Sequence, residues 1–382
     1  MSFLVFLLEL SPLCAIFYLY LSWNQKRASK PPRCSYKKSL FNSLAVQYCS
    51  DLLRKPYRPT IWAFSPILHT AYCRHWSDGA GSSNTEYLQV KSFGLVGICW
   101  PQLQHERHGV KVELTKLSPI VVFITDPLVL DNSVQPFIDG AFKSGFRPTV
   151  FLPQDCQHLP KVRQNSPILL SKRTDNQADF GESIEYINSR YPDALLYIVG
   201  LSFGNATLFQ FITENINRYS INGVASISPI WNQSKSEPPV LKMNNNTVDT
   251  AEDLDDVPKA NFPLTASASK DKRVSFECDR ISKGLTSLTD MPNDVFGKFK
   301  RLGVPMMVLY SRDDPTYSSD QISRVGGMWK NSDLLVVVET SSGGHVGFLK
   351  DFRPSSWAAE LVFQYFDAVG KFKDATIKSL FR

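Results

Sequence analysis

A strand-like run that ends in a glycine–x–serine–x–glycine turn constrains this chain more than any other feature. The stretch ALLYIVGLSFGNATLFQFI, from Ala194 to Ile212, begins with six apolar or aromatic residues and no charge. Such a run is typical of a strand buried on both faces. After Gly204, the apolar positions follow the period of a helix with one packed face. Ser202 therefore falls where a strand turns sharply into a helix, the context of a nucleophile elbow.

Strand-like and helix-like segments alternate through the second part of the chain. Apolar runs predict further strands, and amphipathic patterns predict the helices between them. The strands are expected over 119–125, 147–153, 223–230, 305–311 and 334–340, and the helices over 133–145, 176–192 and 355–369. Such alternation predicts an α/β fold with a doubly wound, mostly parallel sheet.

The rest of the chain falls into three predicted parts. We expect a core over 119–382, with a variable polar insert at about 232–303 that shows no sustained period. An aromatic- and proline-rich segment over 25–118 precedes it. The first part, residues 1–24, is predicted to be a membrane anchor, because Phe3 to Trp23 is almost wholly apolar despite Glu9 and Pro12.

The charge pattern supports the anchor and argues against nucleic acid. The formal net charge is +6, and six basic residues in one stretch without acids account for all of it: Lys26, Arg27, Lys30, Arg33, Lys37 and Lys38. The remaining charges balance, so no nucleic-acid surface is expected. Basic residues after the apolar segment favour an anchored globular domain in the cytoplasm, and we expect it at the endoplasmic reticulum. A cleaved signal peptide or a buried helix are the alternatives.

The cysteines predict neither a metal site nor a disulfide framework. The chain has seven, scattered and without a Cys-x-x-Cys pair. Nothing in the sequence calls for a cofactor.

Two further residues are candidates to act with Ser202. A serine nucleophile needs a base, and that base needs a carboxylate to orient it. Only His345 among the histidines follows the later strands, and Asp313 and Asp314 come directly after the strand over 305–311. All of these candidates fall at carboxyl ends of predicted strands, where sites on open α/β sheets lie. Each also has a structural alternative: a tight turn for Ser202, a packed loop residue for His345 and a helix cap or turn acid for Asp314.

The motifs resemble those of the membrane-anchored α/β-hydrolase-domain lipases related to the YheT-type esterases. The resemblance lies in GLSFGNA, SRDDPTY, GGHVGFLKD and YPDALLYIVG, and it covers roughly residues 34–370. It implies that Asp314, the second acid of its motif, completes a triad with Ser202 and His345. It also implies hydrolysis of lipid carboxylic esters, such as monoacylglycerols or phospholipids, at a membrane. Upstream, His69-Thr70 stands where the family has a Gln-Thr pair.

One region departs from that family. The oxyanion of acyl transfer needs two N–H donors, one from Phe203 and one from the loop after the strand 119–125. This loop reads Thr125-Asp126-Pro127-Leu128 where the family has Pro-Gly-Leu. If Pro127 aligns with the donor residue, one donor is lost, because proline has no N–H; a shift of one residue would let the N–H of Leu128 serve instead. An impaired scaffold that binds a lipid or a protein partner is therefore the alternative to an active hydrolase.

Overall fold

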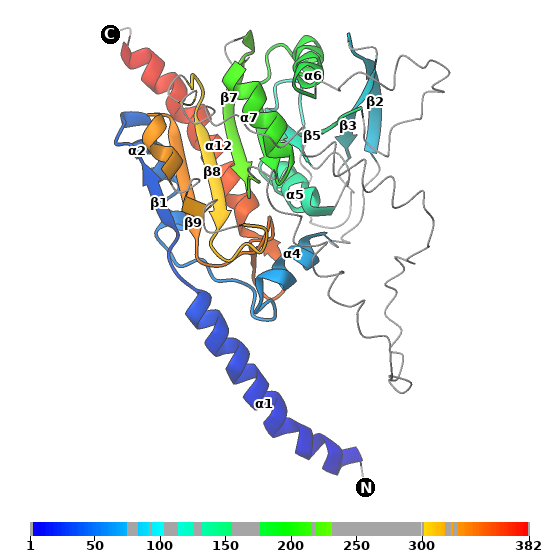
Figure 1. Ribbon diagram of the computed structural model, residues 1–382, viewed down its shortest axis with the longest axis vertical. Helices are drawn as coiled ribbons and strands as arrows, with labels where there is room; N and C mark the ends of the chain where they lie inside the picture. Colours follow the sequence, from blue (N-terminus) through cyan, green and yellow to red (C-terminus); the bar gives the residue numbers. More distant parts are fainter. Residues whose placement is uncertain are drawn as a thin grey trace, which may run out of the picture. The chain divides into compact units, whose positions relative to one another are not determined.

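The central sheet is built mainly from parallel strands (Figure 1). The computed structural model describes residues 3–74, 83–91, 94–102, 114–125, 132–154, 176–214, 218–230, 299, 302–317, 322–323 and 327–380. Among these residues, nine strands form one sheet in the order β1-β9-β8-β7-β6-β4-β5-β3-β2. The strands are β1 (Arg33–Tyr36), β2 (Ser83–Gln89), β3 (Leu95–Pro101), β4 (Ile120–Ile124), β5 (Arg147–Leu152), β6 (Leu196–Leu201), β7 (Ile221–Ile227), β8 (Met306–Ser311) and β9 (Leu335–Thr340).

The pairing confirms the predicted doubly wound, mostly parallel sheet. Parallel ladders join β5, β4, β6, β7, β8 and β9, whereas β1, β2 and β3 pair antiparallel at the two edges. Every residue of β4, β6 and β8 is buried. Their uninterrupted apolar runs reflect this burial, because helices cover both faces of a parallel sheet.

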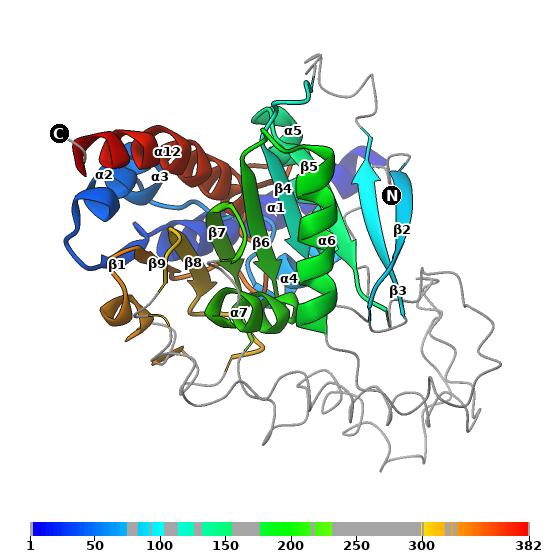
Figure 2. The ribbon, with the colours of Figure 1, turned by 90° about the horizontal axis from the view of Figure 1, so that it is seen from above.

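Helices lie on both sides of the sheet (Figure 2). The helices of the described residues are α1 (Phe3–Ala28), which extends away from the sheet in Figure 1, and α2 (Leu40–Tyr48), α3 (Ser50–Leu53), α4 (Pro66–Arg74), α5 (Gln135–Lys143), α6 (Asn176–Arg190), α7 (Gly204–Glu214) and α12 (Trp357–Leu380). The pairs α12–α2 and α12–α5 pack together on one face, and α6 packs against α7 on the other. Short elements complete the description: η1 (Asn132–Val134), η5 (Met328–Asn331) and the hairpin of β10 (Leu349–Lys350) with β11 (Ser355–Ser356).

The segment over 25–118 supplies both edges of the sheet. β1 pairs antiparallel with β9, from Arg33 opposite Glu339 to Tyr36 opposite Val336. At the other edge, β3 pairs with β5 and carries β2. The same segment supplies α4, whose buried side packs against the loop that follows β9. It therefore contributes directly to the surroundings of the candidate site.

The predicted anchor over residues 1–24 is not supported. Within the described part of the chain, no helix is both long enough and apolar enough to cross a membrane. The segment belongs to α1, which contains Glu9 and Pro12 in its first half and Lys26 and Arg27 in its last turn. These residues shorten its continuous apolar stretch. The predicted cytoplasmic side and endoplasmic reticulum location depended on that anchor and lose their basis. The insert predicted at about 232–303 lies almost wholly outside the described residues.

Candidate active site

The turn between β6 and α7 holds Ser202 in a strained conformation. Its φ angle is +51°, in the left-handed region that non-glycine residues rarely adopt. Ser202 donates its backbone N–H to the carbonyl of Ile227 at 3.1 Å. The Asn205 side-chain amide donates to the carbonyls of Ser202 and Ile227 at 2.9 and 3.0 Å. These bonds to the end of β7 fix the strained turn.

The two glycines of the turn are required by close contacts. A Cβ atom on Gly200 would lie 2.5 Å from the side-chain oxygen of Asn205 and 2.7 Å from Leu208. A Cβ atom on Gly204 would lie 2.2 Å from the carbonyl oxygen of Ile124, at the end of β4. Because that neighbour is backbone, it cannot move aside as a flexible side chain could. The glycine–x–serine–x–glycine pattern therefore has a steric cause.

Ser202, His345 and Asp314 form a continuous chain of hydrogen-bonding atoms. Ser202 Oγ lies 2.7 Å from His345 Nε2, and His345 Nδ1 lies 2.8 Å from Asp314 Oδ2. These three residues follow β6, β9 and β8, so the sheet brings their distant positions to one edge. His345 and Asp314 are only 3% and 4% exposed, which keeps competing water from the bond between them. The arrangement can move a proton from the serine hydroxyl to the imidazole while the carboxylate stabilises the resulting charge.

Thr316 holds the second oxygen of Asp314. Its backbone N–H and its hydroxyl both donate to Asp314 Oδ1, at 2.9 and 2.6 Å. Burial raises the pKa of Asp314, but the charge and hydrogen bond of His345 and the two Thr316 bonds outweigh that effect and lower the pKa below its usual value. The carboxylate therefore stays ionised and keeps its other oxygen for the histidine.

The loop that carries His345 is held by backbone donors. Gly343 and Gly344 have φ angles of +150° and +62°, and Val346 follows at +62°. The N–H of Gly344 donates to Asp313 Oδ1 at 2.9 Å, and the N–H of His345 donates to Thr70 Oγ1 at 2.9 Å. Asp313 thus supports the loop, while Asp314 contacts the imidazole.

Two buried side chains outside the candidate triad complete this support. Ser228 Oγ accepts the N–H of Val346 at 3.0 Å, and His69 Nδ1 accepts the N–H of Leu349 at 3.3 Å. Burial lowers the pKa of His69 to about 4, so its imidazole is neutral at physiological pH. The sequence identified His69-Thr70 only by its resemblance to the family's Gln-Thr pair, and it predicted neither the loop contacts of His69 nor the role of Ser228.

Of the two predicted oxyanion donors, the structure describes Phe203 but not Leu128. Phe203 lies directly after Ser202, and its N–H has no hydrogen-bond partner among the described residues. Asp126, Pro127 and Leu128 lie outside the described residues. No group of three or more His, Cys, Asp or Glu side chains in the described part of the chain is arranged to hold a metal ion. The contact between Ser202 Oγ and His345 Nε2 has the geometry that nucleophilic attack by a serine requires.

Comparisons with known proteins find relatives that include a monoacylglycerol lipase and a phospholipase. No family model matches the sequence. The chain is 23% identical to human Protein ABHD15 over 78% of this chain and 65% of that protein, so it spans less than two thirds of that relative. It is 20% identical to mouse Monoacylglycerol lipase ABHD2 over 94% of this chain and 91% of that protein. It is 22% identical to bovine Phospholipase ABHD3 over 88% and 84% of the two chains.

Solved structures support the fold. The esterase Pf2001 from Pyrococcus furiosus matches with a TM-score of 0.50 and 12% identity, over 75% of this chain and 91% of that one. At this identity the likeness concerns the α/β-hydrolase fold alone.

Proposed function

We propose that this chain, which belongs to the abhydrolase domain-containing proteins, is a serine hydrolase of lipid carboxylic esters. The observation that carries the proposal is the hydrogen-bonded sequence Ser202–His345–Asp314, with distances of 2.7 and 2.8 Å. The names of the relatives, a monoacylglycerol lipase and a phospholipase, support a lipid ester as the substrate class.

In the proposed reaction, Ser202 Oγ attacks the acyl carbonyl carbon as His345 Nε2 takes the hydroxyl proton. The carbonyl oxygen becomes an oxyanion, which accepts the N–H of Phe203 and that of Leu128. His345 then returns the proton to the leaving alcohol, and the acyl group stays on Ser202. Water then attacks the acyl carbonyl carbon as His345 Nε2 takes its proton, and the imidazolium gives that proton to Ser202 Oγ as the ester bond breaks, which releases the fatty acid and the free serine. Asp314 stays ionised throughout and holds the imidazole by Nδ1.

The test is labelling of the full chain with a fluorophosphonate, which reacts with an activated serine. We expect labelling of the wild type and of Ser144→Ala, a variant of an exposed serine at the end of α5. We expect no labelling of Ser202→Ala, and protection of the wild type by a medium-chain monoacylglycerol. Labelling that persists in Ser202→Ala would refute the assignment of the nucleophile. A folded wild type without labelling would instead favour the non-catalytic scaffold.

A further inference from the structure

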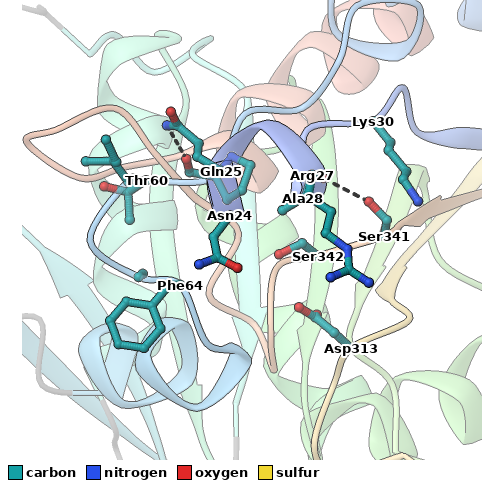
Figure 3. A pocket seen from close by; sticks show the side chains of 13 residues that line it. Asn24, Gln25, Arg27, Ala28, Lys30, Thr60, Phe64, Asp313, Ser341 and Ser342 are labelled. Carbon is teal, nitrogen blue, oxygen red and sulfur yellow. Dashed lines mark hydrogen bonds between the residues drawn. The ribbon is translucent and has the colours of Figure 1, made fainter. Parts of the chain in front are cut away.

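A polar pocket adjoins the acid turn, on the side of Asp313 (Figure 3). Its volume is about 280 Å³. It is lined by the last turn of α1, the segment over 59–64, Asp313 and the two serines after β9, Ser341 and Ser342. Ser341 donates its hydroxyl to the carbonyl of Ala28 at 3.0 Å, so the end of α1 is tied to the strand that leads to His345.

The charges around this pocket favour an anion. Arg27 and Lys30 line it, and neither has an ion-pair partner among the described residues. The guanidinium of Arg27 lies 5.5 Å from the centre of the Trp23 ring, a contact that leaves its charge uncompensated. Asp313 is the one carboxylate among the described lining residues, and its Oδ1 already accepts from Ser311 and Gly344. Two cations against one carboxylate suit a phosphate group.

An apolar surface begins at the rim of the same pocket. Phe64 lines the pocket and is 51% exposed. It continues into the outer face of α4, where Ile67, Leu68 and Tyr72 are also exposed. Positions three and four residues apart lie on one side of a helix. We call these four residues the α4 apolar face.

The polarity of α4 is the reverse of an ordinary surface helix. Its inner side carries His69 and Thr70, which bond the loop around His345, together with the buried Cys73, whereas its larger apolar side chains, Ile67, Leu68 and Tyr72, face outward. A surface helix normally turns its apolar side to the core. Exposed contiguous apolar surface marks an interaction site. Because the helix also supports the candidate site, whatever covers the α4 apolar face lies beside that site.

We propose that the pocket and the α4 apolar face together bind an anionic phospholipid at a lipid surface. The phosphate lies between Arg27 and Lys30, and the acyl chain runs from Phe64 over Ile67 and Leu68. A phospholipid fits because it joins a phosphate to apolar acyl chains, as Phe64 joins the cationic pocket to the α4 apolar face. The choice of a lipid rests on the proposed function, but binding itself requires no turnover.

The first experiment measures co-sedimentation of the full chain with vesicles. One set is phosphatidylcholine alone, and the other is phosphatidylcholine with phosphatidylserine at about three to one. Replacing both pocket cations, in Arg27→Gln/Lys30→Gln, should reduce binding to the anionic vesicles on the order of tenfold. The control is Lys26→Gln, because Lys26 is an exposed neighbour that does not line the pocket. The pocket variant removes two positive charges and Lys26→Gln removes one, so the double variant Lys26→Gln/Lys38→Gln serves as the control with the same net charge. Equal losses in both double variants would overturn the pocket.

The second experiment tests the α4 apolar face. Ile67→Ser/Leu68→Ser should weaken binding to both vesicle types, whereas Leu117→Ser/Leu195→Ser, at exposed leucines elsewhere, should not. Unchanged binding by the α4 variant would overturn the proposal. Binding of inorganic phosphate distinguishes a site for a lipid headgroup from a site for a free anion. If phosphate binds saturably and this binding depends on Arg27 and Lys30, while vesicle binding is unchanged in the variants, the pocket is a free-anion site and the lipid proposal is overturned. Fluorophosphonate labelling of each variant reports the hydrolase separately, so failure of one proposal is distinguishable from failure of the other.

Discussion

Replacing His69 with glutamine is expected to make the stability of the protein less sensitive to acid. His69 is fully buried, and burial lowers its pKa from 6.5 to about 4. The unfolded chain exposes the imidazole and returns its pKa to the ordinary value. Between pH 6.5 and about 4, the unfolded state therefore binds a proton that the folded state excludes. Stability must fall as the pH falls through this window, and most of the loss comes above the folded pKa.

The size of the effect follows from the shift. Each pKa unit corresponds to about 1.36 kcal/mol, so His69 should reduce the free energy of unfolding by about 2 kcal/mol between pH 7.5 and pH 5. Glutamine does not titrate, and its side-chain oxygen can accept the N–H of Leu349 in place of Nδ1. The variant should therefore keep the loop bond and lack this part of the pH dependence.

The measurement is urea denaturation of wild type and His69→Gln at a series of pH values from 7.5 to 5. Groups common to both proteins cancel when the two pH profiles are subtracted. We expect the difference between them to grow by about 2 kcal/mol toward pH 5 in favour of the variant. Parallel profiles would refute the reasoning, because they would mean that His69 titrates alike in the folded and unfolded chains.

Three further changes test the candidate site. Gly204→Ala should lower ester hydrolysis at least tenfold by forcing a Cβ atom against the carbonyl of Ile124, and Gly327→Ala, where a Cβ atom meets nothing within 4 Å, should leave it unchanged. Thr316→Val should lower kcat on the order of tenfold and raise the apparent pKa of the acidic limb of the pH–rate profile, because Asp314 loses a hydroxyl donor. Thr316→Ser keeps a hydroxyl and should restore both kcat and this pKa. Equal rates in the two variants would contradict the role of the hydroxyl. Pro127→Gly separates the two registers of the oxyanion loop: it should raise the rate if Pro127, and not Leu128, stands at the donor position, and an unchanged or lower rate would refute donor loss at Pro127.

The sequence predicted the parts of the fold that depend on local pattern. The strands over 119–125, 147–153 and 334–340 were readable because burial on both faces leaves an uninterrupted apolar run. The elbow was readable because its turn requires glycines at fixed positions around Ser202. The sequence misjudged residues 1–24, where apolar composition alone suggested an anchor that the described helices do not support.

What the sequence alone determined is the order of the chemistry-bearing residues and the strand ends on which they fall. Only the tertiary structure decided how they meet: that Ser202 Oγ and Asp314 flank one imidazole, and that Thr70 and Ser228 support its loop. The reason is that a period of apolar residues records which side of an element is buried, but not which element buries it. Hydrogen bonds between residues far apart in the chain leave no such period, and so the support of His345 by α4 could be found only in three dimensions.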